Sequence, residues 1–563
     1  MLRIILEQQV NRCVLSKEIG RFIYMIGNVS FIEALSILSK SSPFAVSTEN
    51  NGRKTSLLNE IKDYLYIQSP IEEKVLSTIS SFCNRNKKIL FLCGSSGDGK
   101  SEILTRCKKK FDSRVRFHLD ATHSFSPNEN AIQTLDREIE DYQSGETPLV
   151  IGINTGMLAN YAEEGANQAV KQSIRAYLNR ESYSDEFVFI NFEDFPKFLI
   201  SDDGYHAEFP EKFLKRITQH EDNILRQLYD KDKANKDDVD SKRLFANYEL
   251  LSLPSVQSVI IDLLFKARLK KDQFLTARAL LDFIFGLLAG PGYLFDNLFS
   301  GGDNELAEKI VEFDPANIRT KQIDRFILAF ELKLTDKDFE DFREELTKIG
   351  ISRVKKAHSY LRLFYTFKYG DYANNYHANF RSDFSESLIE KYIHCYKLHR
   401  DFNGDKAERE LLKAFYNKIL IQAVRNHINR NAPTLSKNQD LIAELNSYLL
   451  TAKLDIKPDY KSIQNDKPQS ASYFHIHLKV KVNDSEVRIR PIPLNINLLG
   501  LLIDIVSGFR PNKHDKSSIV ILDELVDDIT KVANQSHDIQ IVKGCQRFEL
   551  RKVEDDDIEV SEV

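Results

Sequence analysis

The sequence ILFLCGSSGDGKSEIL, residues 89–104, decides which fold the chain is expected to adopt. It begins with a short apolar run of strand length, continues with a loop that contains three glycines, and resumes as an amphipathic helical pattern near Lys100. Residues 94–101 match the pattern G-x-x-x-x-G-K-[ST] at every position. This order of strand, glycine-rich loop and helix is typical of a cradle that binds nucleotide phosphates.

Each residue type in this cradle has a physical reason. Glycine permits backbone angles that turn successive N–H groups toward an anion, and the start of the following helix adds the positive end of its dipole. Lys100 is expected to reach the β and γ phosphates of ATP, and the Ser101 hydroxyl is expected to bind Mg²⁺. The predicted cofactor-binding set is Gly94, Ser95, Ser96, Gly97, Asp98, Gly99, Lys100 and Ser101.

Apolar runs of strand length alternate with helical patterns in this part of the chain. They are ILFLC (89–93), VRFHLD (115–120), LVIGIN (149–154) and FVFINF (187–192). Strands that alternate with helices predict a parallel sheet covered on both faces. We therefore expect an α/β fold with a P-loop NTPase core similar to the AAA+ class. An N-terminal helical region, a large helical middle region and a small C-terminal α+β domain would accompany it.

A length of 563 residues predicts two to four domains. The predicted segments are an N-terminal helical region (1–85), the NTPase core with its lid helix (86–290), a helical domain (291–455), a C-terminal α+β domain (456–553) and an acidic tail (554–563).

Several local patterns refine this division. The stretches 39–53 and 229–243 are expected to form loops, the second solvated because it is highly charged. Helices are predicted to continue from about 255 to 450. A β-hairpin is predicted at 474–494, strands at 538–542 and 547–553, and disorder in the acidic tail.

The acid that would hold Mg²⁺ is predicted to be Asp120, which ends the apolar run VRFHLD. The alternative is a strand-end aspartate that caps a loop. Asp136 competes for the role but lies within a helical pattern. The sequence IVILDEL (519–525) resembles a strand that ends in Asp-Glu, yet its apolar residues fall on one helical face, so we predict a helix there, with Asp515 as its N-cap.

Two further residues are candidates for catalysis. Asn154 ends the run LVIGIN, where an AAA+ ATPase places a polar residue that senses the γ-phosphate; the alternative is a turn former. Arg278 begins a helical pattern and resembles the arginine of a lid helix; the alternative is a surface arginine. Arg175 and Arg180 are candidates for a role in a neighbouring subunit if the protein forms an oligomer.

The formal net charge of −5 argues against attraction of the whole protein to nucleic acid, so a DNA contact would be local. In the predicted 474–494 hairpin, basic residues share the face opposite the apolar one, as a ribbon that follows phosphates would require. The alternative is a solvated sheet face. The basic residues proposed to contact DNA are Lys479, Lys481, Arg488 and Arg490.

The six cysteines are scattered, which argues against disulfides and a zinc site and predicts a reducing cytoplasm. The N-terminal residues do not have the pattern of a signal peptide. No run reaches about 18 apolar residues, so a membrane span is not expected.

Beyond the cradle, several short stretches of the sequence resemble those of the DptF family of DNA phosphorothioation-dependent restriction proteins. The stretches that carry the resemblance are LSKSSPFAV (38–46), YLYIQSPIEEKVL (64–76), LCGSSGDGKSEILTR (92–106), FHLDATHSFSPNENAIQTLD (117–136), LVIGINTGML (149–158), INFEDFPKF (190–198) and GFRPNKHDKSSI (508–519). Many ATPases would share the cradle alone, so its combination with DATHSF and FEDFPKF is the more specific sign of this family.

The resemblance implies a place in bacterial defence systems that mark host DNA with sulfur and attack DNA lacking the mark. The chain would then be the ATP-driven component that acts with DptG- and DptH-type proteins, and not itself the nuclease. The residues agree with that limit, because no metal-nuclease pattern or nucleophile triad is recognisable. The alternative is a nucleotide-gated scaffold that assembles partner proteins with little turnover.

Overall fold

The computed structural model of the chain describes residues 29–42, 55–85, 87–111, 114–122, 130–352, 354–432, 435, 439–446, 448–482, 485–511, 516–536, 538–544, 546–552 and 558–562. The chain divides into two compact units. Unit 1 contains Met1–Lys197 and Ala207–Ser385, and unit 2 contains Phe198–His206 and Glu386–Val563. The boundary at residue 385 falls inside the span 291–455 that the sequence groups as one helical domain.

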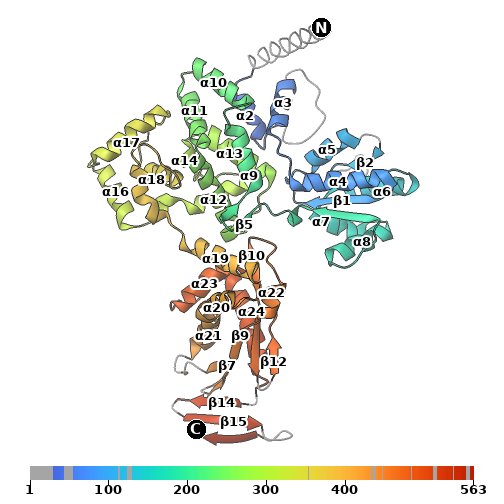
Figure 1. The fold of residues 1–563 in the computed structure, drawn as a ribbon, viewed down its shortest axis with the longest axis vertical. Helices are drawn as coiled ribbons and strands as arrows, with labels where there is room; N and C mark the ends of the chain where they lie inside the picture. The colour runs from blue at the N-terminus through green and yellow to red at the C-terminus, as the bar shows by residue number, and fades with distance from the viewer. Residues whose placement is uncertain are drawn as a thin grey trace. The chain divides into compact units, whose positions relative to one another are not determined.

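Unit 1 contains a parallel sheet with the strand order β2-β3-β1-β4 (Figure 1). Its strands are β1 (Ile89–Gly94), β2 (Arg116–His118), β3 (Leu149–Asn154) and β4 (Phe187–Asn191). The four predicted strands and the mixed α/β class are therefore confirmed. The carboxyl ends of the strands meet at one edge, because Gly94 lies opposite Asn154 and Cys93 lies opposite Asn191.

Helices cover both faces of this sheet because successive side chains of β1 point to opposite sides. Ile89, Phe91 and Cys93 pack in one apolar cluster, with residues of α6 (Ala131–Ser144), α7 (Thr155–Glu164) and α8 (Gln168–Leu178). Leu90 and Leu92 pack in the other, with residues of α4 (Pro70–Arg85) and α5 (Lys100–Phe111). In Figure 1, α5 and α8 lie on opposite sides of the sheet.

The rest of unit 1 is helical. Before the sheet come α2 (Phe31–Leu35), η1 (Ser36–Leu38) and α3 (Thr55–Leu65), which confirms the predicted N-terminal helices within the described residues. Most of the predicted 39–53 loop, from residue 43, lies outside the described residues. After the sheet come α9 (Glu208–Thr218), α10 (Ile224–Asn235), α11 (Val239–Ser252), α12 (Pro254–Lys271), α13 (Ala277–Ala289), α14 (Leu294–Asn297), α15 (Glu305–Ile310), η4 (Val311–Phe313), η5 (Pro315–Asn317), α16 (Lys321–Glu331), α17 (Lys337–Lys348), α18 (Ala357–Thr366) and η6 (Tyr376–Phe384).

The prediction of a solvated loop at 229–243 is wrong, because α10 and α11 occupy this stretch. Asn223 and Asp238 cap the two helices with their side chains, so each helix has a local start signal despite its charge. Tyr229 is fully buried and Asp232 is 4% exposed. The carboxylate of Asp232 accepts the backbone N–H of Phe31, which fixes α10 against the N-terminal helix α2.

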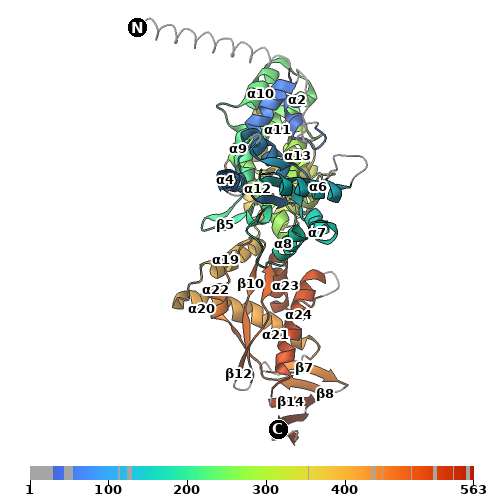
Figure 2. The same ribbon diagram turned by 90° about the vertical axis from the view of Figure 1, so that its right-hand side faces the viewer.

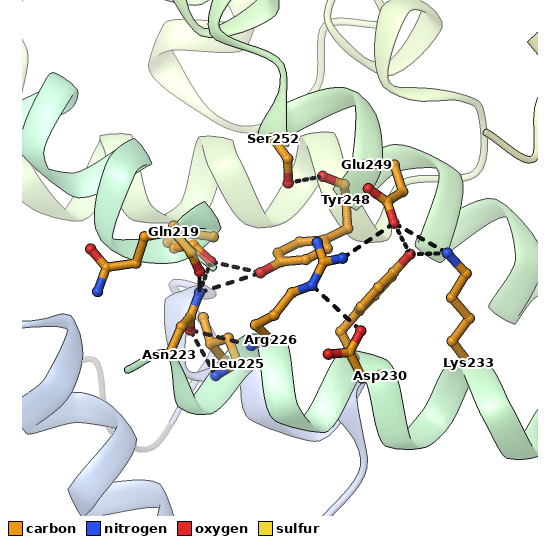
Figure 3. Close-up of polar contacts among 11 residues, drawn as sticks. Gln219, Asn223, Leu225, Arg226, Asp230, Lys233, Tyr248, Glu249 and Ser252 are labelled. Carbon is orange, nitrogen blue, oxygen red and sulfur yellow. Dashed lines mark hydrogen bonds and ion pairs between the residues drawn. The ribbon is translucent and has the colours of Figure 1, made fainter. Parts of the chain in front are cut away.

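A charged and aromatic network holds α10 and α11 together (Figure 3). The guanidinium of Arg226 lies over the rings of Tyr229 and Tyr248, at 4.8 and 5.8 Å from their centroids. Glu249 accepts the Tyr229 hydroxyl and pairs with Lys233 at 3.1 Å. Of the charges that suggested a loop, Lys233 thus pairs with Glu249 of α11, whereas Asp232 pairs with Lys236 at the end of α10.

Unit 2 contains the segment 198–206 and, from residue 386 onward, both helices and strands. Its helices are α19 (Ser387–Asp401), α20 (Lys406–Phe415), the π-helical turn Tyr416–Ile421, α21 (Gln422–Ile428), η8 (Asn429–Asn431), α22 (Tyr460–Asn465), α23 (Ile496–Val506) and α24 (Lys516–Ala533). The helix predicted in place of an IVILDEL strand is confirmed as α24. Asp515, the predicted cap of that helix, lies outside the described residues.

The largest sheet of unit 2 is antiparallel, with the order β16-β15-β14-β8-β7. Its strands are β7 (Asp440–Leu445), β8 (Tyr448–Ala452), β14 (Asp538–Lys543), β15 (Gln546–Lys552) and β16 (Ile558–Glu562), and β7, β8 and β14 are visible side by side in Figure 2. The predicted strands at 538–542 and 547–553 are confirmed. Two predictions are wrong: helices do not continue to 450, and the acidic tail contains a strand, β16, paired with β15.

The hairpin predicted at 474–494 divides into two sheets. The apolar and basic alternation suggested one continuous strand, but it breaks at His477. β10 (Tyr473–Ile476) pairs with β13 (Ile492–Asn495), whereas β11 (Leu478–Val482) pairs with β12 (Ser485–Arg488) and β9 (Asp455–Pro458). Only the β11–β12 part is a hairpin. The apolar face is confirmed, because Phe474, Ile476 and Val480 are at most 1% exposed.

No single helix among the described residues is long and apolar enough to cross a membrane. One bent pair of helices, α11 and α12, has the length and composition of a membrane span, with an angle of 81° between the two helices. Most of its apolar side chains are buried in unit 1.

His399 on α19 predicts an acid-sensitive step in the stability of unit 2. Its Nδ1 donates to the Cys395 carbonyl at 2.8 Å, and its Nε2 accepts from the Tyr416 hydroxyl at 3.2 Å. Burial lowers the pKa of His399 to about 4 from 6.5, and the hydrogen bond to Cys395 offsets this only in part. The unfolded chain therefore binds the proton more tightly, and stability falls as pH falls from 6.5 to 4.

We expect this group to cost about 3 kcal/mol of unfolding free energy over that window, because each unit of pKa shift is about 1.4 kcal/mol. Denaturant unfolding between pH 7 and 4 would measure it. The slope should become shallower in His399→Gln and stay unchanged in His394→Gln, whose histidine is exposed on the same helix. Equal slopes in the wild type and His399→Gln would contradict the prediction.

Candidate phosphate-binding site

The loop between β1 and α5 has two backbone features that the sequence predicted for an anion cradle, namely glycines with positive φ and a helix that follows directly. Gly97 and Gly99 have φ angles of +84° and +100°, a region that side-chain-bearing residues rarely adopt. The helix α5 begins at Lys100, as predicted, so its N-terminal N–H groups border the loop. The Lys100 ammonium donates to the carbonyls of Gly94 and Ser95 at 3.1 and 2.7 Å. The lysine therefore lies folded back along the loop.

The surroundings of Lys100 act on its pKa in both directions. Desolvation by burial lowers the pKa of Lys100, while the carboxylates of Asp98 and Asp120 act in the opposite direction. The nearby ammonium of Lys197 adds to the lowering. Two cations and two carboxylates thus act on one another at this edge of the sheet. A partly desolvated cation gains more from binding an anion than a fully hydrated one does.

Asp98 joins the loop to Lys197, a residue that sequence reasoning did not select. One carboxylate oxygen of Asp98 accepts the Ser95 N–H at 2.7 Å, and the other accepts the Lys197 ammonium at 2.5 Å. The Asp98 side chain is 8% exposed. Lys197 belongs to the stretch FEDFPKF that carried the resemblance, but no spacing rule connects it to a loop 99 residues earlier in the chain.

The helix α13 begins against the loop. The backbone N–H of Arg278 donates to the Gly97 carbonyl at 3.2 Å, and Thr276 caps the helix. A Cβ atom on Gly97 would lie 3.2 Å from the Cβ of Arg278. The structure therefore places the backbone of Arg278 beside the loop. Its side chain is exposed, as the surface-arginine alternative also expects, so a lid arginine stays a prediction.

Asp120 and Asn154 follow neighbouring strands at the edge that carries the loop, and both have local partners. Asp120 Oδ1 accepts the N–H and the hydroxyl of Thr122, at 3.0 and 2.7 Å. Asn154 Oδ1 accepts the Met157 N–H at 2.6 Å and so caps α7. The turn-forming alternatives named for both residues are therefore present. Asp120 also lies close enough to Lys100 to influence its pKa.

Asp136 has a structural role in α6. Its Oδ1 accepts the Tyr161 hydroxyl at 2.5 Å and the Ala166 N–H at 2.9 Å, which ties α6 to the end of α7. Arg175 is likewise engaged within the fold, because its Nε donates to the Ala162 carbonyl at 3.0 Å. Of the two candidate acids, only Asp120 lies at the edge of the sheet that carries the loop.

A Mg²⁺ site would use few protein ligands. In the part of the chain that the structure describes, no group of three or more His, Cys, Asp or Glu side chains is arranged to hold a metal ion. Mg²⁺ at nucleotide sites usually binds one or two protein oxygens, phosphate oxygens and water. The Ser101 hydroxyl, in the first turn of α5, and the Asp120 carboxylate are oxygen donors of the kind that Mg²⁺ prefers, so the residues present fit the ion.

The proposed DNA-contacting residues of unit 2 have acidic neighbours. Lys479 pairs with Glu486 at 2.7 Å and Arg488 with Asp459 at 2.9 Å. The guanidinium of Arg490 lies 2.9 Å from Glu524 and 3.4 Å from Asp528. Lys481 is exposed and lies opposite Glu486 in the β11–β12 ladder. These carboxylates reduce the positive potential that the sequence pattern implied for this face.

Gly94 is predicted to be irreplaceable at the end of β1. A Cβ atom there would lie 2.8 Å from Cδ2 of Phe192 and 3.0 Å from Oδ2 of Asp98. We expect Gly94→Ala to cost about 1–3 kcal/mol by overpacking, measured as a lower midpoint in thermal or denaturant unfolding.

Gly286→Ala is the matched control. Gly286 lies on an exposed face of α13, and a Cβ atom there has no neighbour within 4 Å. The control should raise stability by about 0.4–1 kcal/mol, because alanine restricts the unfolded chain and favours the helix. If Gly94→Ala were as stable as the wild type, Phe192 would not confine the loop.

Comparison with known proteins identifies no family for this chain: no family model, curated protein or solved structure matches it.

Proposed function

We propose that the chain binds ATP with Mg²⁺ in the loop 94–101 and hydrolyses it, as a P-loop NTPase of the AAA+-like type. The observation that carries the proposal is the glycine-shaped loop between a buried strand and a helix whose first residue is Lys100. Such a loop offers backbone N–H donors, a helix dipole and a desolvated cation to one anion. Few ligands other than phosphate groups use all three.

In this proposal each residue has a distinct task. The loop's N–H groups and Lys100 would hold the β and γ phosphates, which requires the Lys100 ammonium to leave the carbonyls of Gly94 and Ser95. Ser101 and Asp120 would hold Mg²⁺, which neutralises phosphate charge. Arg278 would reach the phosphates from the start of α13. Asn154 keeps its amide N–H groups for the γ-phosphate, because its helix cap uses only the carbonyl oxygen.

The wider role proposed is the ATP-dependent component of a DNA phosphorothioation-dependent restriction system. This part rests on the sequence resemblance, and so do the cytoplasmic location, the DptG- and DptH-type partners and the antiviral defence role. In this proposal, hydrolysis would license cleavage of unmarked DNA by a partner protein.

One observation favours the alternative of a nucleotide-gated scaffold. Asp120 Oδ1 already accepts two hydrogen bonds from Thr122, and the next residues along the chain are Ala121 and Thr122 instead of a second acid. An enzyme usually places a base beside the Mg²⁺ acid to orient the attacking water. If the chain is a scaffold, ATP binding without hydrolysis would control its assembly with partner proteins.

ATP turnover with and without DNA and partner proteins tests the proposal. Lys100→Ala should abolish nucleotide binding and turnover, and Asp120→Asn should keep binding but lose Mg²⁺-dependent turnover. Asp136→Asn is the control: it removes the carboxylate charge but keeps an oxygen that can accept from Tyr161 and Ala166, so it should lower stability by no more than about 1 kcal/mol and leave turnover of the folded protein unchanged.

The outcomes separate the two functions. Unchanged turnover in Asp120→Asn would remove Asp120 from the Mg²⁺ site. If the wild type hydrolyses no ATP under any of these conditions, yet Lys100→Ala blocks assembly with partners, the scaffold is the correct function.

A DNA contact at the β11–β12 hairpin is a separate part of the proposal. If Lys479 and Lys481 each bind a phosphate, the double variant with both lysines changed to Gln should bind DNA more weakly at low salt. The slope of log affinity against log salt should fall by about 1.8, or 0.9 per contact. Lys413→Gln, on an exposed part of α20, is the control. An unchanged slope in the double variant would exclude this hairpin as the DNA contact.

A further inference from the structure

The ion pair between Asp98 and Lys197 lies at the point where the chain leaves unit 1. Asp98 is part of the phosphate loop, and Lys197 is the last residue before the chain enters unit 2. Their side chains are only 8% and 25% exposed. A pair that is largely shielded from solvent is screened less by salt than a surface pair, so it holds Lys197 to the loop.

Packing around Lys197 restricts where its ammonium can lie. The ammonium lies 5.6 Å from the centre of the Phe192 ring, over its face. That ring packs against Gly94 at the start of the loop, and Pro196 stiffens the backbone directly before Lys197. The lysine is therefore held by the same residues that confine the loop.

The segment that follows Lys197 belongs to unit 2 and is held there by side chains of α19. Residues 198–206 form the hairpin of β5 (Leu199–Ser201) and β6 (Gly204–His206). Arg400 on α19 donates to the Ile200 carbonyl at 2.7 Å and pairs with Asp202 at 2.5 Å. Lys397 donates to the Asp202 carbonyl at 2.7 Å. Phe198 and Ile200 are 4% and 7% exposed, so the hairpin is also packed.

We propose that the Asp98–Lys197 pair couples nucleotide occupancy of the loop to the stability of the 198–206 hairpin, with Lys197 as a positioning residue that acts through Asp98. This inference rests on the proposed nucleotide binding. Phosphates that order the loop also fix Asp98, and a fixed Asp98 holds Lys197 and the start of the hairpin. Ordering the loop then lowers the conformational entropy that is lost on ordering the hairpin, and the reverse holds as well. Nucleotide binding and hairpin stability therefore favour each other.

Coupling between two sites is reciprocal, so both directions are measurable. Saturating ATP with Mg²⁺ should slow hydrogen exchange of the paired hairpin amides, residues 199–206, by at least about fivefold in the wild-type chain. In the other direction, Arg400→Ala, which loosens the hairpin on the side of unit 2, should weaken binding of a fluorescent ATP analogue by a similar factor.

The variants separate coupling from folding. Lys197→Ala and the neutral polar variant Lys197→Gln should abolish the ATP-dependent protection, whereas Lys197→Arg should retain it because it keeps the charge. Lys212→Ala is the matched control, since it removes a lysine from an exposed pair with Glu208 on α9. Its ATP-dependent protection should equal that of the wild type.

Failure of this inference is distinguishable from failure of the proposed function. A wild-type chain that binds no nucleotide overturns both. A wild-type chain that binds ATP without protection of the hairpin, or whose protection persists in Lys197→Gln, overturns the coupling alone.

Discussion

The packing of β1 between two helical layers is the constraint on which the candidate site depends. Alternate residues of this strand belong to two separate apolar clusters, and every residue of the strand is buried. The strand cannot shift by one residue without exchanging both sets. Its end, and therefore the start of the glycine-rich loop, is fixed relative to β3, β4 and α5. The sheet thus fixes where the loop begins, and Asp98, Phe192 and the start of α13 contact the loop itself.

The parts of the fold that the sequence predicted are those with strong local signals. The four parallel strands are uniform apolar runs, and α24 follows a clear helical period, so local pattern and tertiary burial agree. The charge of the stretch 229–243 suggested a loop, but its charged side chains form ion pairs within the stretch, such as Asp232–Lys236, and with residues outside it, such as Lys233–Glu249. The break at His477 is decided by the strands that pair with β10 and β11, whereas β16 pairs with β15, its neighbour along the chain.

The same distinction applies to the candidate site. The cradle was predictable because its residues are consecutive, and its geometry follows from glycine and a helix start. The start of a helix near Arg278 was predictable from a local pattern, whereas the contact of its N–H with the Gly97 carbonyl joins segments far apart in the chain. Lys197 was not predictable, since a lysine after a proline has no periodic or motif signal. The sequence made Asp136 a competing candidate for the Mg²⁺ acid, whereas in the structure its carboxylate accepts hydrogen bonds from Tyr161 and Ala166.

The path of the chain has a consequence for how the molecule can be divided. Because residues 198–206 belong to unit 2 and both flanking segments belong to unit 1, three peptide connections join the units instead of one. A truncation after residue 385 would leave the hairpin attached to unit 1 without Arg400 and Lys397, and would expose Phe198 and Ile200 to water. The two units therefore cannot be exchanged or lost by a single cut, and recombination between related chains would have to carry both pieces of unit 2 together.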